Sequence, residues 1–153
     1  MQTFLPPQTW VLKRELMWIP IFGWGLAMML PVAIDRKAGK RALKQVITQG
    51  TARLKRGLWL VIFPEGTRTS PGEKKRYAIG GAMLAEKSGF PVVPICHNAG
   101  EFWGKGEFVK RPGTIRVVIG QTIPVEGKRA SQINEEAEEW IESTYLKITT
   151  YKS

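Results

Sequence analysis

Residues 58–68 read LWLVIFPEGTR, an apolar run that passes directly into a turn of polar residues. Leu58 to Phe63 is a short apolar run bounded by Gly57 and Pro64, which is typical of a strand buried on both of its faces. An acid, a glycine and a cation follow in fixed order at the end of that strand. In α/β proteins the ligands bind beyond the carboxyl ends of such strands, so the stretch also marks a candidate site.

Helical patterns occur on both sides of this strand. Residues 38–56 carry apolar residues near helical spacing and end at Gly57, and residues 77–89 do the same and end at Gly89. In the second helix we expect the inward side chains to be Ile79, Met83 and Leu84. Ser131 is a candidate N-cap for a final helix, whose apolar stripe is formed by Ile133, Ala137, Trp140 and Ile141.

Further strands are expected at residues 90–96 and 114–120, and the prolines of the first place it at an edge or a strand end. A polar loop with Pro and Gly covers residues 69–76. Strands that alternate with helices predict an α/β fold with a mixed, largely parallel sheet flanked by helices. The length of 153 residues predicts one domain over residues 1–153.

Residues 16–34 are 19 consecutive uncharged, largely apolar residues between charged flanks. By length alone the run is a candidate for a membrane-spanning helix. However, Pro20 and Pro31 interrupt a single helix, and Gly23 and Gly25 lower the helix propensity between them. We therefore expect a short helix and a strand, partly buried and partly in contact with a membrane surface, rather than a full span.

The formal net charge of +10 suits an anionic partner, such as phospholipid headgroups, nucleic acid or a phosphorylated substrate. Ten basic and two acidic side chains lie between Lys13 and Arg56, whereas residues 135–142 carry five glutamates and no cation. Charge alone does not distinguish a membrane from a nucleic acid. The six tryptophans lie mostly in apolar runs, which disfavours stacking on single-stranded nucleic acid.

Cys96 is the only cysteine and His97 the only histidine. A single cysteine forms no intramolecular disulfide, which fits a reducing compartment. One cysteine and one histidine do not supply a zinc site of the usual kind, so no metal is expected.

The residue types of the Pro-Glu-Gly-Thr-Arg turn suit an anionic ligand. Gly66 allows close backbone approach, Thr67 adds a hydroxyl, and Arg68 offers a planar cation that matches phosphate. Glu65 holds Arg68 or a neighbouring loop in place, or accepts a hydrogen bond from a substrate hydroxyl. The cations of residues 74–76 enlarge the positive field. The alternative is an ordinary turn with an internal Glu–Arg ion pair.

The block VIFPEGTR at residues 61–68 resembles the Phe-Pro-Glu-Gly-Thr-Arg block of the glycerolipid acyltransferases, most closely the lysophosphatidic acid acyltransferases. LPVAIDR at 30–36 resembles their second block, in which an arginine follows an apolar strand, and VVPI at 92–95 resembles their fourth. Bacterial members also carry segments similar to KRELMWIPIFGWG, GGAMLAEKSG and HNAGEFW, so the resemblance covers nearly the whole chain.

This resemblance implies a 1-acylglycerol-3-phosphate O-acyltransferase of phospholipid biosynthesis. A fatty acyl group would pass from acyl-CoA or acyl carrier protein to lysophosphatidic acid and give phosphatidic acid, with no cofactor. Arg36 and Arg68 would hold the substrate phosphate, while Glu65, Gly66 and Thr67 would line the acceptor site. The implied partners are a lysophospholipid, the acyl carrier and an anionic membrane surface. The implied location is the cytoplasmic face of the inner membrane, peripheral or anchored through further N-terminal sequence.

The family's catalytic block, Asn-His, four residues and Asp, is absent from these 153 residues, so no catalytic residue is assigned. Five residues after His97 stands Phe102, and we expect His97 to fix a loop rather than to act as the base. The simplest expectation is a chain truncated at its N-terminus, with weak activity or none by itself. The alternative is a non-catalytic phospholipid- or phosphate-binding module of the same fold.

Overall fold

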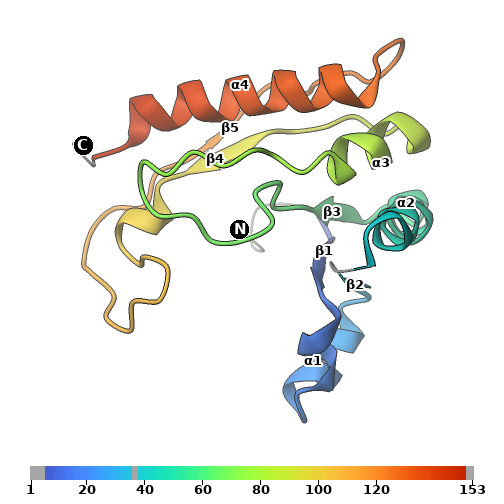
Figure 1. Ribbon diagram of the computed structural model, residues 1–153, viewed down its shortest axis with the longest axis horizontal. Helices are drawn as coiled ribbons and strands as arrows, with labels where there is room; N and C mark the ends of the chain where they lie inside the picture. The colour runs from blue at the N-terminus through green and yellow to red at the C-terminus, as the bar shows by residue number, and fades with distance from the viewer. Residues whose placement is uncertain (1–5, 36–37, 151–153) are drawn as a thin grey trace. The chain divides into compact units, whose positions relative to one another are not determined.

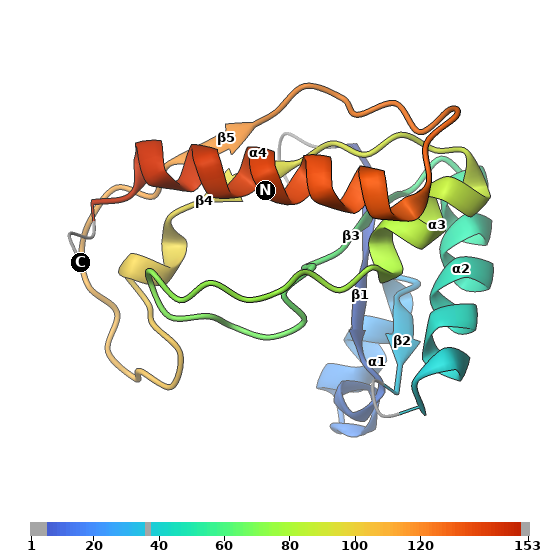
Figure 2. The same cartoon turned by 45° about the horizontal axis from the view of Figure 1, so that its top comes forward.

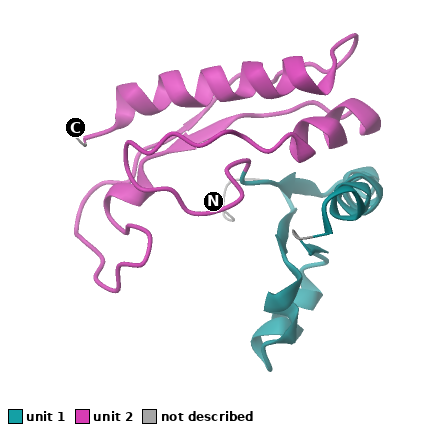
Figure 3. Cartoon of the chain, in the orientation of Figure 1, with its two compact units in different colours: residues 1–63 teal, residues 64–153 magenta. Residues whose placement is uncertain are grey.

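The computed structural model describes residues 6–35 and 38–150, and the chain divides into two compact units, residues 1–63 and 64–153 (Figure 3). Each unit has its own sheet and its own helices. The single domain expected over residues 1–153 remains a prediction.

Unit 1 is built on a three-stranded parallel sheet with the order β2-β1-β3 (Figure 1). Its strands are β1 (Gln8–Lys13), β2 (Val32–Ile34) and β3 (Trp59–Val61). Helix α2 (Lys40–Lys55) leads from β2 to β3 and packs against both strands. The sequence patterns predicted β2, α2 and β3 but missed β1, which occupies the centre of this sheet.

The apolar run of residues 16–34 is not a single helix. It contains the end of the 3₁₀ helix η1 (Arg14–Trp18), the short helix α1 (Phe22–Met28) and strand β2. Over the described residues, no helix is both long enough and apolar enough to cross a membrane. The predicted short helix and strand are confirmed.

The corner between α1 and β2 is held by two side chains. Leu30 has a positive φ of 53°, which is strained for a residue with a side chain. Its carbonyl accepts hydrogen bonds from the fully buried Thr9 hydroxyl, at 3.0 Å, and from Nε of Arg53, at 2.8 Å. Residues of β1 and α2 therefore stabilise the turn into β2.

Burial of β3 on both faces was expected, and this prediction is wrong. Trp59 is 39% exposed, and Phe63, just beyond the strand, is 52% exposed. Among the described strands β3 pairs with β1 alone and forms an edge of the sheet, so a neighbouring strand covers its side chains from one side only. Phe63 instead stacks on Trp10 of β1, with ring centroids 5.9 Å apart.

Unit 2 pairs two short strands with two helices (Figures 1 and 2). Strands β4 (Ile95–His97) and β5 (Val117–Ile119) are antiparallel, so the sheets of the chain as a whole are mixed, with three parallel strands and two antiparallel ones. The long helix α4 (Ala130–Ile148) packs against β4 and against α3 (Gly80–Ser88). A 3₁₀ turn, η3 (Ala99–Glu101), follows β4.

The core of unit 2 lies between α3 and α4, where Ile133 is 1% exposed and packs with Ala82 and Ala130. Two sequence expectations are corrected here. The helix cap is Arg129 rather than Ser131, because the Gln132 side chain accepts the hydrogen bond of the Arg129 amide, at 2.9 Å. Ile79 precedes the first turn of α3 and is 43% exposed instead of facing inward.

Candidate anion-binding site

Two chain segments leave the parallel sheet of unit 1 at the carboxyl ends of its strands. Strand β1 aligns Lys13 with Ile34 of β2 and Trp10 with Val61 of β3. The carboxyl ends of β2 and β3 thus flank β1, offset along it by about 10 Å. Arg36, the first predicted phosphate ligand, follows β2 but lies outside the described residues.

The predicted turn of residues 64–68 begins unit 2 and has an ordered backbone. The carbonyl of Pro64 accepts a hydrogen bond from the amide of Ala78, at 2.8 Å, which closes the loop of residues 64–78. Gly66 has a φ of +69°, and a Cβ built there would meet no atom within 4 Å. The glycine is therefore required by backbone conformation and not by lack of space, and its surroundings are open to a ligand.

Glu65 does not pair with Arg68 within this turn. The half-buried Glu65 carboxylate accepts a hydrogen bond from the hydroxyl of Thr69, at 2.9 Å. Arg68 and Thr67 are exposed. The turn thus directs its acid toward its own loop and its cation toward solvent, which is the arrangement expected if Glu65 holds the loop and Arg68 remains open to a ligand.

The carboxylate of Glu65 also acts on the interior of unit 2. Burial, followed by the charges of Glu142 and Glu65, raises the pKa of Cys96 to about 11. The same three causes, in the same order, raise the pKa of Tyr77, whose hydroxyl donates a hydrogen bond to Glu142 at 3.2 Å. Cys96 and Tyr77 therefore stay protonated at neutral pH, and neither is an activated nucleophile.

Arg68 is positioned by a residue that the sequence patterns did not identify. Its guanidinium carbon lies over the indole ring of Trp103, 5.1 Å from the ring centroid. Nζ of Lys110 lies 4.7 Å from the same centroid. The two positive charges are thus within about 10 Å of each other, a separation over which like charges still repel in physiological salt. An anion bound near them would relieve this repulsion.

Trp103 is itself held in place. Its indole Nε1 donates a hydrogen bond to the carbonyl of Glu107, at 2.8 Å, while its backbone amide donates to the carbonyl of Ala99, at 3.2 Å. Figures 1 and 2 both show the green loop of residues 64–79 reaching the yellow turn of residues 99–101. One sequence signal was available, because Trp103 stands in the polar segment GEFWGKGEFVKR and not in an apolar run.

His97 and Glu101 make separate contacts. His97 Nδ1 accepts a hydrogen bond from the amide of Ala99, at 3.3 Å, so this ring nitrogen is used within the loop. The Glu101 carboxylate accepts hydrogen bonds from the hydroxyls of Thr149 and Thr150 and from the amide of Thr150. Burial by itself would raise the pKa of Glu101, but these hydrogen bonds outweigh it and lower the pKa. Glu101 therefore anchors the loop to the end of α4.

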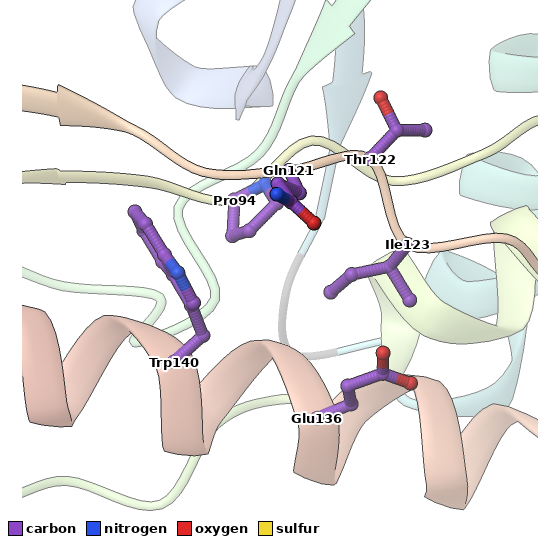
Figure 4. Close-up of a pocket in the computed structure, with 6 residues that line it drawn as sticks. All are labelled: Pro94, Gln121, Thr122, Ile123, Glu136 and Trp140. Carbon is purple, nitrogen blue, oxygen red and sulfur yellow. The ribbon is translucent and has the colours of Figure 1, made fainter.

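A shallow pocket lies elsewhere in unit 2, where the segment after β5 passes α4 (Figure 4). None of the predicted site residues that the structure describes lines it, and the charged residue in its lining, Glu136, is in an ion pair with Lys128. Its six lining residues are Pro94, Gln121, Thr122, Ile123, Glu136 and Trp140. Across residues 6–35 and 38–150, no three His, Cys, Asp or Glu side chains gather closely enough to bind a metal ion.

Known proteins share both the sequence and the fold of this chain. The 1-acyl-sn-glycerol-3-phosphate acyltransferase of Pseudomonas aeruginosa is 47% identical over 149 residues, which are 95% of this chain and 58% of that protein. The protein of the same name from Cocos nucifera is 29% identical over 125 residues, 81% of this chain and 41% of its own length. The chain thus spans about half the length of these relatives.

A solved structure has the same fold. The crystal structure of the 1-acyl-sn-glycerophosphate (LPA) acyltransferase PlsC from Thermotoga maritima matches with a TM-score of 0.78 and 25% identity, over 96% of this chain and 59% of that one. The expected α/β fold is therefore confirmed. In addition, the sequence profile of the acyltransferase family matches residues 1–98, well over half of the chain. The chain belongs to the acyltransferase family.

Proposed function

We propose that this chain forms the acceptor-binding part of a 1-acylglycerol-3-phosphate O-acyltransferase. The enzyme would transfer a fatty acyl group from acyl-CoA or acyl carrier protein to lysophosphatidic acid and give phosphatidic acid, a step of phospholipid biosynthesis. Support comes from the names of relatives that match most of this chain, one of them at 47% identity.

The observation that carries this proposal is the position of Arg68. The guanidinium is exposed at an open turn, and Trp103 fixes its orientation. A planar, permanently charged fork held in this way suits the phosphate of lysophosphatidic acid, which accepts paired hydrogen bonds. Gly66 leaves room for the glycerol backbone beside it, and Glu65 keeps the loop in shape through Thr69.

The reaction joins the free hydroxyl oxygen of the acceptor to the thioester carbonyl carbon of the donor. The C–S bond breaks, an ester C–O bond forms, and the hydroxyl proton ends on the thiol that leaves. A general base speeds such a step by roughly 10²–10⁴-fold. The described chain offers charge and orientation for the acceptor, while the Nδ1 atom of its one histidine is used by the amide of Ala99.

A membrane surface is the proposed source of the acceptor, since lysophosphatidic acid resides in lipid. Unit 1 offers an apolar surface on η1 and α1, where Trp18 is 75%, Trp24 71% and Met28 85% exposed. The exposed cations Lys13 and Arg14 precede it, which favours anionic headgroups. These features support peripheral attachment to an anionic membrane surface, and the cytoplasmic face of the inner membrane is the location that we propose for it.

Acyl transfer tests the proposal directly. The 153-residue chain and the complete reading frame that encodes it are each assayed with acyl-CoA or acyl carrier protein as donor. The acceptors are lysophosphatidic acid and monoacylglycerol, which lacks the phosphate. We expect the complete reading frame to use lysophosphatidic acid in strong preference. Equal use of both acceptors, or no transfer to either, would remove the proposed activity.

A second candidate is a phospholipid- or phosphate-binding module of the same fold. It is favoured by one observation, the absence of a His-x₄-Asp block from these 153 residues. The same assay separates the two candidates when it is paired with binding measurements. Tight binding of lysophosphatidic acid by both proteins, with transfer by neither, would establish the module.

A further inference from the structure

The loop between β4 and β5 presents an apolar tip to solvent. Phe108 is fully exposed (101%) and Val109 is 73% exposed. Large apolar side chains are exposed on many proteins, but a phenylalanine with no covering neighbour at the end of a projecting loop is a specific feature. In Figures 1 and 2 this loop extends away from α4.

The tip is held by structure at its base. Residues 104–107 form a turn in which the Glu107 amide donates to the Gly104 carbonyl, at 3.3 Å, with Gly106 at a φ of 79°. The Glu107 side chain forms an ion pair with Arg111, at 2.9 Å, and the Arg111 amide donates to the carbonyl of Phe102, at 2.8 Å. Phe108 and Val109 are therefore held out at a fixed place between these contacts.

Cations surround the apolar tip. Lys105, Lys110 and Arg111 are all exposed, and Glu107, the one acid within residues 104–111, is paired with Arg111. Lys105 also lies near enough to Glu73 to help lower the pKa of that carboxyl, after the larger effect of the hydrogen bond from the Ser70 amide. The loop of residues 69–76, with its own cations Lys74, Lys75 and Arg76, is thus adjacent.

An aromatic tip flanked by lysine and arginine matches the boundary between headgroups and acyl chains of an anionic bilayer. The apolar side chains enter that boundary, and each nearby cation adds attraction to lipid phosphates. A protein partner would need an apolar surface far larger than two side chains, since stable interfaces bury about 800 Å² on each partner. The observations therefore favour lipid.

We propose that the loop of residues 104–111 docks on a bilayer that contains anionic phospholipid, with Phe108 and Val109 inserted and Lys105 and Lys110 among the phosphates. Lys110 shares the Trp103 ring with Arg68, so docking brings the lipid surface to the candidate acceptor site. The inference rests on the proposed function in one respect, because the lipid substrate of that function is the reason for the protein to bind a membrane. Docking itself requires no acyl transfer.

A fluorophore at the tip tests insertion. Cys96 is 3% exposed, so Phe108→Cys can be labelled selectively with a polarity-sensitive dye, and Leu146→Cys, at a 70% exposed position on α4, is the matched control. Vesicles are phosphatidylcholine alone or mixed with phosphatidylglycerol. For the dye at position 108 we expect a blue shift and a several-fold rise in emission with the vesicles that contain phosphatidylglycerol, and neither change with pure phosphatidylcholine vesicles. An unchanged spectrum at 108, or equal changes at both positions, would overturn the proposal.

Flotation with the same vesicles gives a second readout. The double variant Phe108→Ser, Val109→Ser should lose about tenfold in partitioning to anionic vesicles, because it loses two apolar side chains from the interface. Leu146→Ser should partition as the parent chain does. Undiminished partitioning of the double variant would contradict the proposal, as would a parent chain that does not float with anionic vesicles.

The failure of this inference is distinguishable from the failure of the proposed function. If the complete reading frame transfers acyl groups to lysophosphatidic acid while the tip label reports no insertion, the loop does not dock and the function stands. If the tip label reports insertion but no transfer to lysophosphatidic acid occurs, docking stands while the function fails.

Discussion

The guanidinium of Arg68 rests on the indole ring of Trp103, with 5.1 Å between the guanidinium carbon and the ring centroid. These residues lie in two different loops of unit 2, one before α3 and one after β4. A cation on an aromatic face gains roughly 0.5–1 kcal/mol at an exposed site. The contact thus orients Arg68 without occupying the hydrogen-bond donors that a phosphate needs.

Removal of the Trp103 ring should weaken substrate binding and leave the chemical step intact. In the active enzyme, we expect Trp103→Leu to raise the KM for lysophosphatidic acid about 3- to 10-fold with little change in kcat, because Arg68 loses its support. Trp103→Tyr keeps an aromatic face and should restore most of the affinity. A matching fall in kcat for both variants would point to a general structural role instead.

A side chain at Gly66 should strain the turn. The φ of +69° is costly for alanine although the space is open, so Gly66→Ala should lower the free energy of unfolding by about 1 kcal/mol. Gly100→Ala is the control, since its added Cβ also meets no atom within 4 Å and its φ lies outside the left-handed range. Urea unfolding of both variants checks this. Equal stability would show that the turn relaxes without cost.

The contacts of Glu101 predict a dependence of stability on pH. Its pKa is lowered in the folded state from the usual 4.5, so its stabilisation is present above that value and is lost as the pH falls through the folded pKa. We expect Glu101→Gln to lower stability by about 1 kcal/mol at pH 7 and to have little effect in acid. Glu139→Gln, at an exposed position of α4, should leave the stability unchanged at pH 7. An effect that is independent of pH would contradict this account.

Cys96 should be unreactive while the chain is folded. Its thiol is 3% exposed, and burial together with the charges of Glu142 and Glu65 raises its pKa to about 11, so little thiolate is present at pH 8. A thiol reagent should modify it only as fast as the chain opens, and denaturant should remove the protection. Immediate modification of the native chain would contradict the burial and the charge environment described here.

Local sequence patterns were sufficient to predict those elements whose ends are marked by glycine or proline in the sequence. The helix of residues 38–56 was predicted from apolar spacing and from Gly57, and α2 covers Lys40–Lys55. The run of residues 16–34 was divided correctly because a proline in the interior of a helix removes a backbone hydrogen bond and clashes with the preceding turn. Helix starts were less exact, since the cap of α4 depends on a hydrogen bond from the backbone amide of Arg129 to the side chain of Gln132.

Contacts between distant segments were not predicted. Strand β1 follows two prolines, and only three of its six residues are apolar, yet it lies at the centre of its sheet because β2 and β3 pair with it. Trp103 meets Arg68 across a long stretch of sequence, and Glu101 meets Thr149 in the same way. Tertiary packing brings these pairs together, and the local spacing of apolar residues in the sequence does not predict such contacts.

Binding of the acceptor phosphate by Arg68 is tested by the affinities for two acceptors, one with the phosphate and one without it. Lysophosphatidic acid and monoacylglycerol are titrated into the parent chain, into Arg68→Gln and into Arg129→Gln, a control at an exposed arginine. Of the two variants, we expect only Arg68→Gln to lose affinity for lysophosphatidic acid, by about 10- to 100-fold, with no change for monoacylglycerol. Undiminished affinity of Arg68→Gln for lysophosphatidic acid, or equal losses for both lipids, would contradict it.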